Sequence, residues 1–371
     1  MKPIVTAAIT LAVCFLLSPG IAYPQLTAPP GGGNKKASVT EMIGITNVTV
    51  SYHRPRVKGR EGLIWGKLVH VGYADLGIGT SKEAPWRAGA NDNTTIELSD
   101  DVRIDGHPLP AGKYGFFIAY GPDECTLIFS KNNSSWGSFY YDPKEDALRV
   151  NVKPVALEKS VEWLTFDFSN ETENSAVVSL SWEKLKIPFT IEVDYPATQL
   201  ASFRKELRGD KGLIWQTWNE AAQWCAQRNI NLDQALQWAD TATSDALGGE
   251  HNFQTWSTRA QVLEKLGRTT EAAETMKKAW PYANELEMHQ FARQLIAQKR
   301  NKEALDVFQK NFDKHPGEYL TTMGLVRGYS ATGNYTKALE LAQKALTLAD
   351  PSSKGTVESM IQLLKAGKDI N

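Results

Sequence analysis

The sequence predicts an all-β antiparallel sandwich followed by an all-α array of helical repeats. Between residues 37 and 194, short runs of alternating apolar and polar residues are separated by Gly, Pro, Asn and Asp, a pattern typical of antiparallel strands. After about residue 195, apolar residues recur every three to four positions, as they do in amphipathic helices. Small residues then recur at intervals of 37, 32 and 34 residues, which indicates internal repeats.

Length and composition agree with two globular domains. The chain has 371 residues, and about 150 residues make an average domain. Its hydrophobic content of 42% and charged content of 22% are those of a folded protein. The formal net charge of −1 speaks against nucleic acid as a main partner, because phosphate binding needs a clustered positive excess.

The first 22 residues predict a secretory signal peptide. Lys2 precedes an apolar run from Ile4 to Leu17, and Ala22 stands before a plausible cleavage point. The run is shorter than the roughly 20 residues that span a bilayer. We therefore expect an exported protein, periplasmic or extracellular, with no membrane span after cleavage. Residues 23–36 are rich in Pro and Gly and predict a flexible leader.

Residues 37–194 predict the β-sandwich domain, with about nine or ten strands. Clear alternation occurs at Val48–Tyr52, Leu148–Val152 and Trp163–Phe168. Residues 54–92 are the exception, because they are rich in Gly, Arg and Trp and read as one long loop excursion. Long loops inside a compact domain are often functional.

Residues 195–212 predict a junction helix between the two domains. Leu200, Phe203 and Leu207 are spaced three and four apart, so they share one helix face that must be buried. The first helical hairpin and the end of the sandwich are the two candidate surfaces. We expect a packed interdomain interface here; the alternative is that the helix only caps the repeats while the β domain moves freely.

Residues 213–371 predict helical repeats that end in a capping helix at Lys354–Lys365. Small residues stand where the second helix of each hairpin would cross the first: Ala235, Ala272, Ala304 and Ala338. Over residues 214–352 this pattern resembles the tetratricopeptide repeat family. The resemblance implies a curved scaffold whose concave face binds segments of other proteins. An ordinary helical bundle with chance alanines is the alternative.

Several phrases in the β domain resemble one further family. They are Tyr52-His53-Arg54-Pro55 with Lys58-Gly59-Arg60, Ile64-Trp65-Gly66, Trp86-Arg87-Ala88-Gly89-Ala90-Asn91, Leu109-Pro110-Ala111-Gly112-Lys113-Tyr114 and Trp136-Gly137-Ser138-Phe139-Tyr140-Tyr141-Asp142. In order and spacing they resemble domain-of-unknown-function family 2911, found in exported bacterial proteins, over most of residues 37–182. The resemblance implies fold and localisation and brings no reaction, catalytic residue or ligand with it.

Arg, Trp and Asn side chains in these loops form the candidate ligand-binding site. The residues are Arg54, Lys58, Arg60, Trp65, Trp86, Arg87, Asn91 and Trp136. Tryptophan offers a flat apolar face, and arginine a planar fork that matches carboxylates, so a carbohydrate or a carboxylated ligand would fit such a site. The alternative is that the tryptophans seal the end of the sandwich while the arginines hydrogen-bond loop carbonyls.

Residue patterns for catalysis are weaker. His53, His70 and His107 lack the short spacing of zinc motifs, so we predict no metal and no cofactor. Ser134 and Ser135 lie in no Gly-x-Ser-x-Gly elbow, and catalytic residues stay unknown.

After cleavage two cysteines remain, Cys125 in a predicted strand and Cys225 in a predicted helix. We expect two buried free thiols, with an interdomain disulfide as the alternative.

These patterns favour a non-enzymatic binding or assembly protein of the bacterial envelope over an enzyme. The repeats would bind a protein partner. The alternative is a small-ligand binding protein, or an enzyme, that acts through the Arg- and Trp-rich loops of the β domain.

Overall fold

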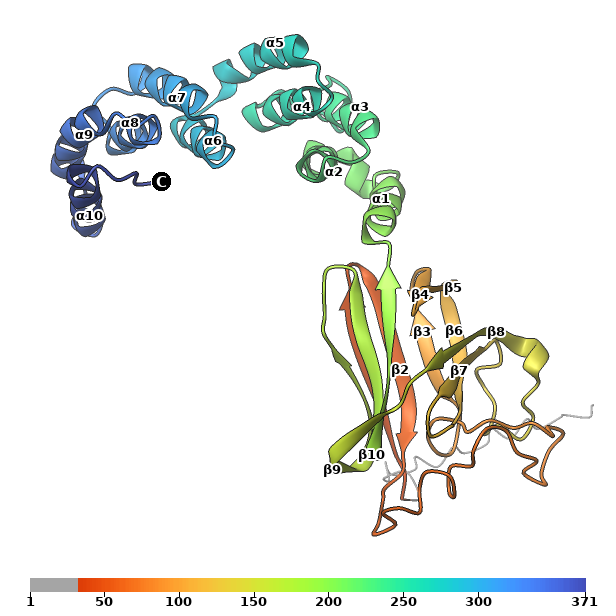
Figure 1. The fold of residues 1–371 in the computed structure, drawn as a ribbon. Helices are drawn as coiled ribbons and strands as arrows, with labels where there is room; N and C mark the ends of the chain where they lie inside the picture. Colours follow the sequence, from red (N-terminus) through yellow and green to blue (C-terminus); the bar gives the residue numbers. More distant parts are fainter. Residues whose placement is uncertain (1–32) are drawn as a thin grey trace, which may run out of the picture. The chain divides into compact units, whose positions relative to one another are not determined.

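The structure is a computed structural model that describes residues 33–371 (Figure 1). The predicted signal peptide, residues 1–22, and residues 23–32 of the predicted leader lie outside the described residues. The chain divides into two compact units between Thr198 and Gln199, a β unit and a helical unit. Across residues 33–371, no helix combines the length and the apolar character that crossing a membrane requires.

The β unit contains two antiparallel sheets, which confirms the predicted sandwich. The six-stranded sheet has the order β1 (Lys35–Ile43), β2 (Thr46–Arg54), β3 (Thr94–Leu98), β6 (Gly112–Ala119), β7 (Cys125–Ser130) and β8 (Asp146–Val152). The four-stranded sheet has the order β5 (His107–Leu109), β4 (Val102–Ile104), β10 (Ser175–Val193) and β9 (Val155–Ser169). One hydrophobic core, to which both sheets contribute, fills the space between them.

A β-bulge at Glu183 explains how one long strand faces the core along its whole length. Before it, the buried apolar residues of β10 are even-numbered, as at Leu180 and Trp182. After it they are odd-numbered, as at Phe189 and Ile191. The pairing with β9 shifts on both sides of Glu183, whose φ is +51°. Because side chains alternate with a period of two, the extra residue is what keeps both halves directed inward.

The outer face of the six-stranded sheet is covered by loops. Along β6, Phe116 and Ile118 belong to the main core, whereas Phe117 and Ala119 belong to a second cluster with Tyr141. The rings of Phe117 and Tyr141 lie 5.5 Å apart. Both faces of this strand are therefore buried, which explains its nearly continuous apolar sequence.

Residues 55–93, between β2 and β3, form the long excursion that the sequence predicted. Within this described stretch the backbone makes only isolated bridges, among them Trp86 with Ile118, Ala74 with Ala84 and Val71 with Tyr120. The bridges to Ile118 and Tyr120 hold the loop against the end of β6, and the bridge between Ala74 and Ala84 closes the loop on itself.

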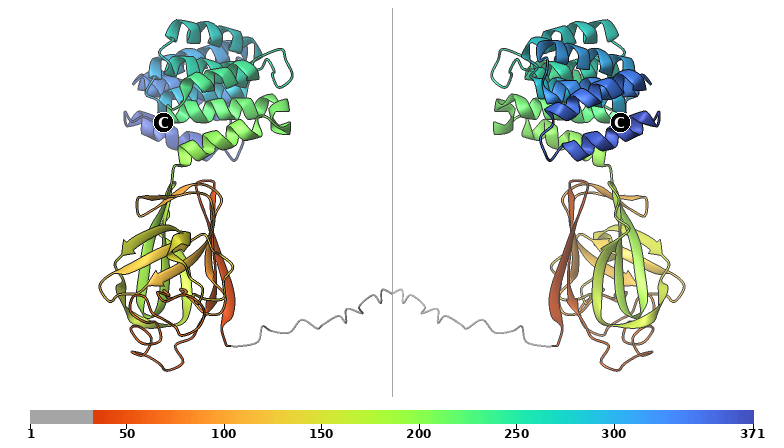
Figure 2. Two further views of the ribbon diagram at one scale, coloured as in Figure 1. Left: turned by 90° about the vertical axis from the view of Figure 1, so that its right-hand side faces the viewer. Right: turned by 90° about the vertical axis from the view of Figure 1, so that its left-hand side faces the viewer.

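The helical unit contains antiparallel hairpins stacked side by side (Figure 1 and Figure 2). The helices are α1 (Tyr195–Glu206), α2 (Trp215–Arg228), α3 (Leu232–Ala242), α4 (Phe253–Lys265), α5 (Thr269–Ala279), α6 (Glu285–Ala297), α7 (Asn301–Lys314), α8 (Tyr319–Ala331), α9 (Tyr335–Leu348) and α10 (Lys354–Lys365). The hairpins are α2/α3, α4/α5, α6/α7 and α8/α9, and α10 is the predicted capping helix.

The alanines that indicated repeats lie in the second helix of each hairpin. Ala235, Ala304 and Ala338 are fully buried and Ala272 is 8% exposed. Small side chains at these positions let the paired helices approach closely. The prediction of tetratricopeptide-like repeats is therefore confirmed in the helices themselves.

The apolar face of α1 packs within the helical unit. Leu200, Phe203 and Leu207 join the cluster of α2 and α3, and the Phe203 ring lies 5.5 Å from that of Trp224 and 6.1 Å from that of Trp238. The first hairpin is thus one surface that buries this face. A packed interface between the two units stays a prediction.

Candidate functional site

Two of the three candidate tryptophans in the β-domain loops, Trp65 and Trp86, pack in or against the core. Trp86 is 8% exposed and stacks on Trp182 with ring centroids 6.1 Å apart. Trp65 meets the edge of Trp86 at 5.5 Å, and its indole nitrogen donates to the Trp182 carbonyl at 3.2 Å. These rings close the sandwich, so their flat faces are occupied by each other.

The arginines of the same loops donate to backbone carbonyls. Arg54 donates through Nε to the Leu164 carbonyl at 2.8 Å. Arg60 donates through Nε to the Val57 carbonyl at 2.9 Å, and Arg87 donates through Nη1 to the Asn91 carbonyl at 2.9 Å. These forks fix the path of the loops, the arrangement that the structural alternative expected.

Arg87 also connects two of the sequence segments that resemble the DUF2911 family, residues 86–91 and residues 136–142. Its guanidinium lies 5.1 Å from the centre of the Phe139 ring, and burial lowers its pKa. A Cβ atom at Gly137, where φ is +70°, would stand 2.3 Å from Arg87 Cζ. Only glycine fits there, so the phrase from Trp136 to Asp142 packs directly on the phrase from Trp86 to Asn91.

The remaining candidates lie in separate surroundings. Trp136 is 60% exposed, and Lys58 is also exposed. Lys58 and Asn91 both adopt positive φ, 52° and 58°, as turn residues do. Arg54 lies beside β9, whereas Arg87 lies in the loops near Phe139. Ligand binding by these loops therefore stays a prediction, and no common pocket of these side chains supports it.

The polar cluster nearest to these loops is internally paired. The Tyr141 hydroxyl donates to Asp146 Oδ2 at 2.7 Å, and Arg149 donates to the same carboxylate at 2.6 Å and to the Tyr141 oxygen at 2.8 Å. Burial, followed by the bond to Asp146, raises the pKa of Tyr141. The cluster ties the loop that carries Tyr141 to β8.

Groups suited to metal binding or nucleophilic chemistry do not gather in the described part of the chain. Among residues 33–371, no three His, Cys, Asp or Glu side chains come together as potential metal ligands. Cys125 and Cys225 are buried free thiols, each inside its own unit. Burial raises the pKa of Cys225 to about 11, which keeps it protonated at neutral pH.

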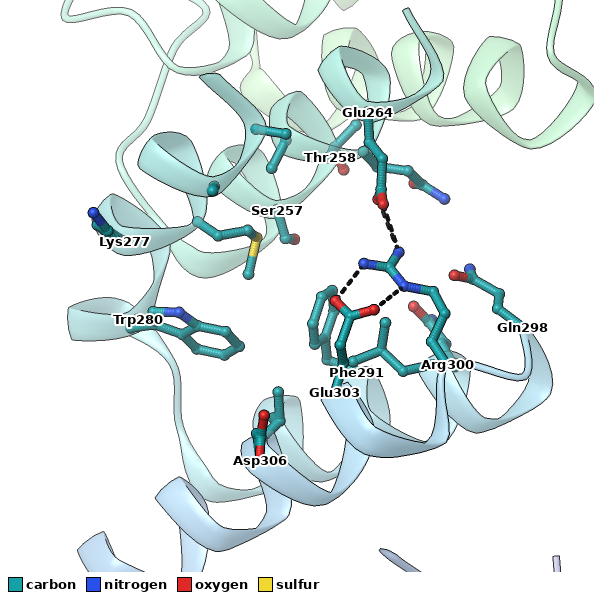
Figure 3. Close-up of a pocket in the computed structure, with 18 of the residues that line it drawn as sticks. Ser257, Thr258, Glu264, Lys277, Trp280, Phe291, Gln298, Arg300, Glu303 and Asp306 are labelled. Carbon is teal, nitrogen blue, oxygen red and sulfur yellow. Dashed lines mark hydrogen bonds and ion pairs between the residues drawn. The ribbon is translucent and has the colours of Figure 1, made fainter. Parts of the chain in front are cut away.

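A cavity of about 620 Å³ lies in the helical unit, between the hairpins α4/α5 and α6/α7 (Figure 3). Successive hairpins elsewhere pack closely, α3 on α4 and α7 on α8, but α5 does not pack closely on α6. Sequence analysis missed this site, because the alanine spacing across it is close to the regular repeat length.

An aromatic cluster forms one wall of the cavity. Trp280, in the 3-10 turn Trp280–Tyr282 after α5, has its ring 5.7 Å from that of Phe291 on α6 and 5.8 Å from that of Phe253 on α4. Lys310 on α7 places its ammonium 5.6 Å from the Trp280 ring. Met276 adds a thioether to the lining. This side offers a polarisable apolar surface.

Ion pairs connect the hairpins on another side. Arg300, at the start of α7, donates to Glu264 of α4 at 2.9 Å and to Glu303 at 2.7 and 2.8 Å (Figure 3). Its bonds to Glu303 and then to Glu264 raise the pKa of Arg300, and Arg300 in turn lowers the pKa of Glu303. The three charges are therefore paired and fixed.

Four glutamine side chains also line the cavity: Gln223, Gln261, Gln294 and Gln298. Within residues 33–371, none of these amides makes a side-chain hydrogen bond to another residue of the chain. Each primary amide supplies donors and an acceptor together. The cavity thus combines an apolar wall, a side of paired charges and amides that are free of side-chain hydrogen bonds.

Comparison with known proteins finds a family that the β unit resembles. Residues 34–191 match the family described as "Protein of unknown function (DUF2911)", which confirms the predicted resemblance. No curated protein matches the chain significantly.

Solved structures of MamA are similar to part of the chain. One titled "MamA RS-1 ArsTM double mutant" is 18% identical and has a TM-score of 0.29; the match covers 44% of this chain and 87% of that one. "MamA 41-end from Desulfovibrio magneticus RS-1" is 19% identical, with a TM-score of 0.27 and coverage of 43% and 90%. These identities and TM-scores are too low to carry an argument. The helical repeats are recognised from the hairpins of this chain alone.

Proposed function

We propose that this chain, a DUF2911 domain joined to a tetratricopeptide-like scaffold, is a non-enzymatic binding protein that holds an extended segment of a partner protein between the hairpins α4/α5 and α6/α7. The observation that carries the proposal is the cavity of about 620 Å³ with free glutamine amides beside an aromatic wall. Its volume lies within the range of about 300–1,000 Å³ that ligand pockets occupy.

The amides favour a polypeptide main chain as the ligand. An extended segment presents unpaired N–H and C=O groups along both edges, and both must be hydrogen-bonded when they leave water. Gln261 on α4, Gln294 on α6 and Gln298 just after α6 offer matching groups from the two sides of the gap. Binding through the main chain would accept many sequences.

The aromatic wall would give the site a preference for an apolar side chain in the bound segment. Trp280, Phe291 and Met276 would contact one apolar residue of the bound segment. Arg300 is paired with both Glu264 and Glu303, so its guanidinium is occupied within the chain and does not call for an acidic partner. We therefore expect an apolar residue at the centre of the recognised segment.

A binding role follows from the chemistry of the lining. Amide side chains do not ionise near neutral pH, and Arg300, Glu264 and Glu303 are held by one another. General acid–base catalysis needs a group that titrates near the working pH and reaches the reacting atom. The lining is better suited to hydrogen bonding than to proton transfer.

Export belongs to the same proposal. The apolar run from Ile4 to Leu17 supports secretion, and cleavage after Ala22 would place the mature chain in the bacterial envelope or outside the cell. Mass spectrometry of the chain recovered from cell fractions tests this. A cytoplasmic chain that retains Lys2 would refute it.

Selection of peptides from a displayed library, with the full chain as target, tests the binding role. Peptides that occupy the cavity should lose about tenfold or more in affinity with Trp280→Ala, because a buried aromatic contact contributes about 2 kcal/mol. Gln294→Ala should cost about fivefold, as a main-chain hydrogen bond contributes about 1 kcal/mol.

Gln290→Ala is the matched control, since Gln290 is an exposed glutamine on the same helix and does not line the cavity. Far-UV circular dichroism shows whether each variant keeps its helices. Selected peptides that bind folded Gln294→Ala and Trp280→Ala chains as tightly as the wild type would refute the site.

A further inference from the structure

The segment after the last helix folds back onto α8 (Figure 1). Ser330 donates through Oγ to Asp369 Oδ1 at 2.6 Å, and the Ile370 backbone N–H donates to the same Ser330 oxygen at 3.1 Å. The amide of Asn371 donates to the Arg327 carbonyl at 3.1 Å. Ile370 is partly buried against the core of the helical unit. We call residues 367–371 the tail.

The tail contacts α8, and α8 and its neighbour α6 carry basic side chains. His289 and Arg293 are four residues apart on α6, and therefore share one face. That helix packs on α8, which carries Arg327. The charge of Arg293 lowers the pKa of Arg327 across this helix contact, after the larger effect of burial.

This cluster is not neutralised by the chain. Among the described residues, neither Arg293 nor Arg327 has an acidic side chain within ion-pair distance. The charge of Asp369 acts on Arg327, but Oδ1 of that carboxylate accepts hydrogen bonds from Ser330 and Asn371.

We propose that Arg293 on α6 and Arg327 on α8 form a binding site for an extended acidic segment of a partner protein, and that the tail occupies part of this site until the partner displaces it. The tail shows the chemistry that the surface accepts: an acidic residue, an apolar residue and a side-chain amide in an extended segment. The partner segment binds more tightly than the tail because it directs a carboxylate between the two arginines, a pairing that Asp369 does not make.

Detaching the tail from α8 requires little free energy. Few hydrogen bonds and one partly buried apolar side chain hold it, and a segment with so few contacts opens readily. The site lies on α6 and α8, whereas the cavity described above lies between α4/α5 and α6/α7. The two proposals rest on different residues, and either one stands if the other fails.

Fluorescence anisotropy with a labelled, amidated peptide tests the site on the full chain. The probes are the tail sequence Gly-Lys-Asp-Ile-Asn and a variant that ends in Glu instead of Asn. Loosening the tail with Ile370→Ser should raise the affinity for both probes about tenfold over the wild type, because the competing segment is released. The probe ending in Glu should bind more tightly than the tail sequence.

In the loosened chain, Arg293→Ala and Arg327→Ala should each reduce the affinity for the acidic probe at least fivefold. Lys302→Ala is the matched control, since Lys302 is an exposed cation on α7 and should change little. Asp369→Asn is a milder second way to loosen the tail if Ile370→Ser lowers helicity.

Three results would overturn the proposal. The loosened chain fails to bind either probe, or the Lys302 and Arg293 variants lose affinity equally, which indicates non-specific charge attraction. The third is a concentration-dependent dimer of the wild-type chain in sedimentation, lost with Ile370→Ser. That result would identify a second copy as the occupant.

Discussion

Acidification should unfold the helical unit because His289 is buried in its neutral form. The side chain is 7% exposed on α6 and lies against Phe308, with ring centroids 5.3 Å apart. Desolvation, and then the charges of Arg327 and Arg293, lower its pKa from 6.5 to about 4. Charging the imidazole inside the folded unit is therefore unfavourable.

The sign and size of the effect follow from proton linkage. Between pH 6.5 and 4 the unfolded chain binds more protons at this residue than the folded chain does, so the stability contributed by neutral His289 is fully present above pH 6.5 and is lost as pH falls. With these two pKa values, acidification from pH 8 to pH 5 costs about 2 kcal/mol, and the full loss approaches about 3 kcal/mol.

Urea unfolding followed by circular dichroism at 222 nm measures this effect, because the long helices all belong to the helical unit or its junction. His289→Leu keeps a similar side-chain volume and removes the titrating group. We expect the variant to lose about 2 kcal/mol less than the wild type between pH 8 and pH 5. Parallel pH profiles for the two chains would show that His289 is not the group that titrates.

Four further substitutions test local packing and capping. Gly324→Ala on α8 would place a Cβ atom 2.5 Å from Phe308 Cδ1 and should lower the free energy of unfolding by about 1–3 kcal/mol, whereas Gly355→Ala on α10 faces open space and should raise it by up to about 1 kcal/mol; urea unfolding compares the two. Asn284→Ala removes the side chain that accepts from the Glu287 backbone at the start of α6, and should cost about 1 kcal/mol in the same assay. Trp136→Ser should leave the thermal midpoint of the β unit nearly unchanged, because the ring is 60% exposed; a fall of many degrees would show that the ring packs in solution.

Much of the fold could be predicted because periodicity reports which face of an element is buried. The alanines of the second helices and the capping helix Lys354–Lys365 were found in this way, and the structure places them as predicted. The two runs of β10 read as separate strands, since their buried positions differ in parity. Glu183 joins them, and a bulge leaves no mark in local propensity beyond that change of parity.

The predicted loop site illustrates why residue type alone does not define a site. Arginine and tryptophan suit carboxylates and sugars, but their donors serve backbone carbonyls equally well. A loop as long as residues 55–93 has many carbonyls that its own backbone leaves unpaired, and Arg54, Arg60 and Arg87 bind such groups. The sequence shows the donors of these hydrogen bonds and does not show which acceptors reach them.

The cavity in the helical unit arises where the regular stacking of repeats is interrupted. Pro281 has no backbone N–H, and with it α5 ends at Ala279 and the chain turns through Trp280–Tyr282. The Trp280 ring then contacts Phe253 of one hairpin and Phe291 of the next, and its bulk separates the two hairpins there. On another side, the ion pair of Arg300 with Glu264 connects them. The space between these two supports cannot be filled by the small residues that close the other hairpin contacts. Apolar surface and amides that regular stacking would bury are left accessible there, and a partner segment is what would bury them. A tryptophan followed by proline between two repeats is thus the signal in the sequence that points to this site.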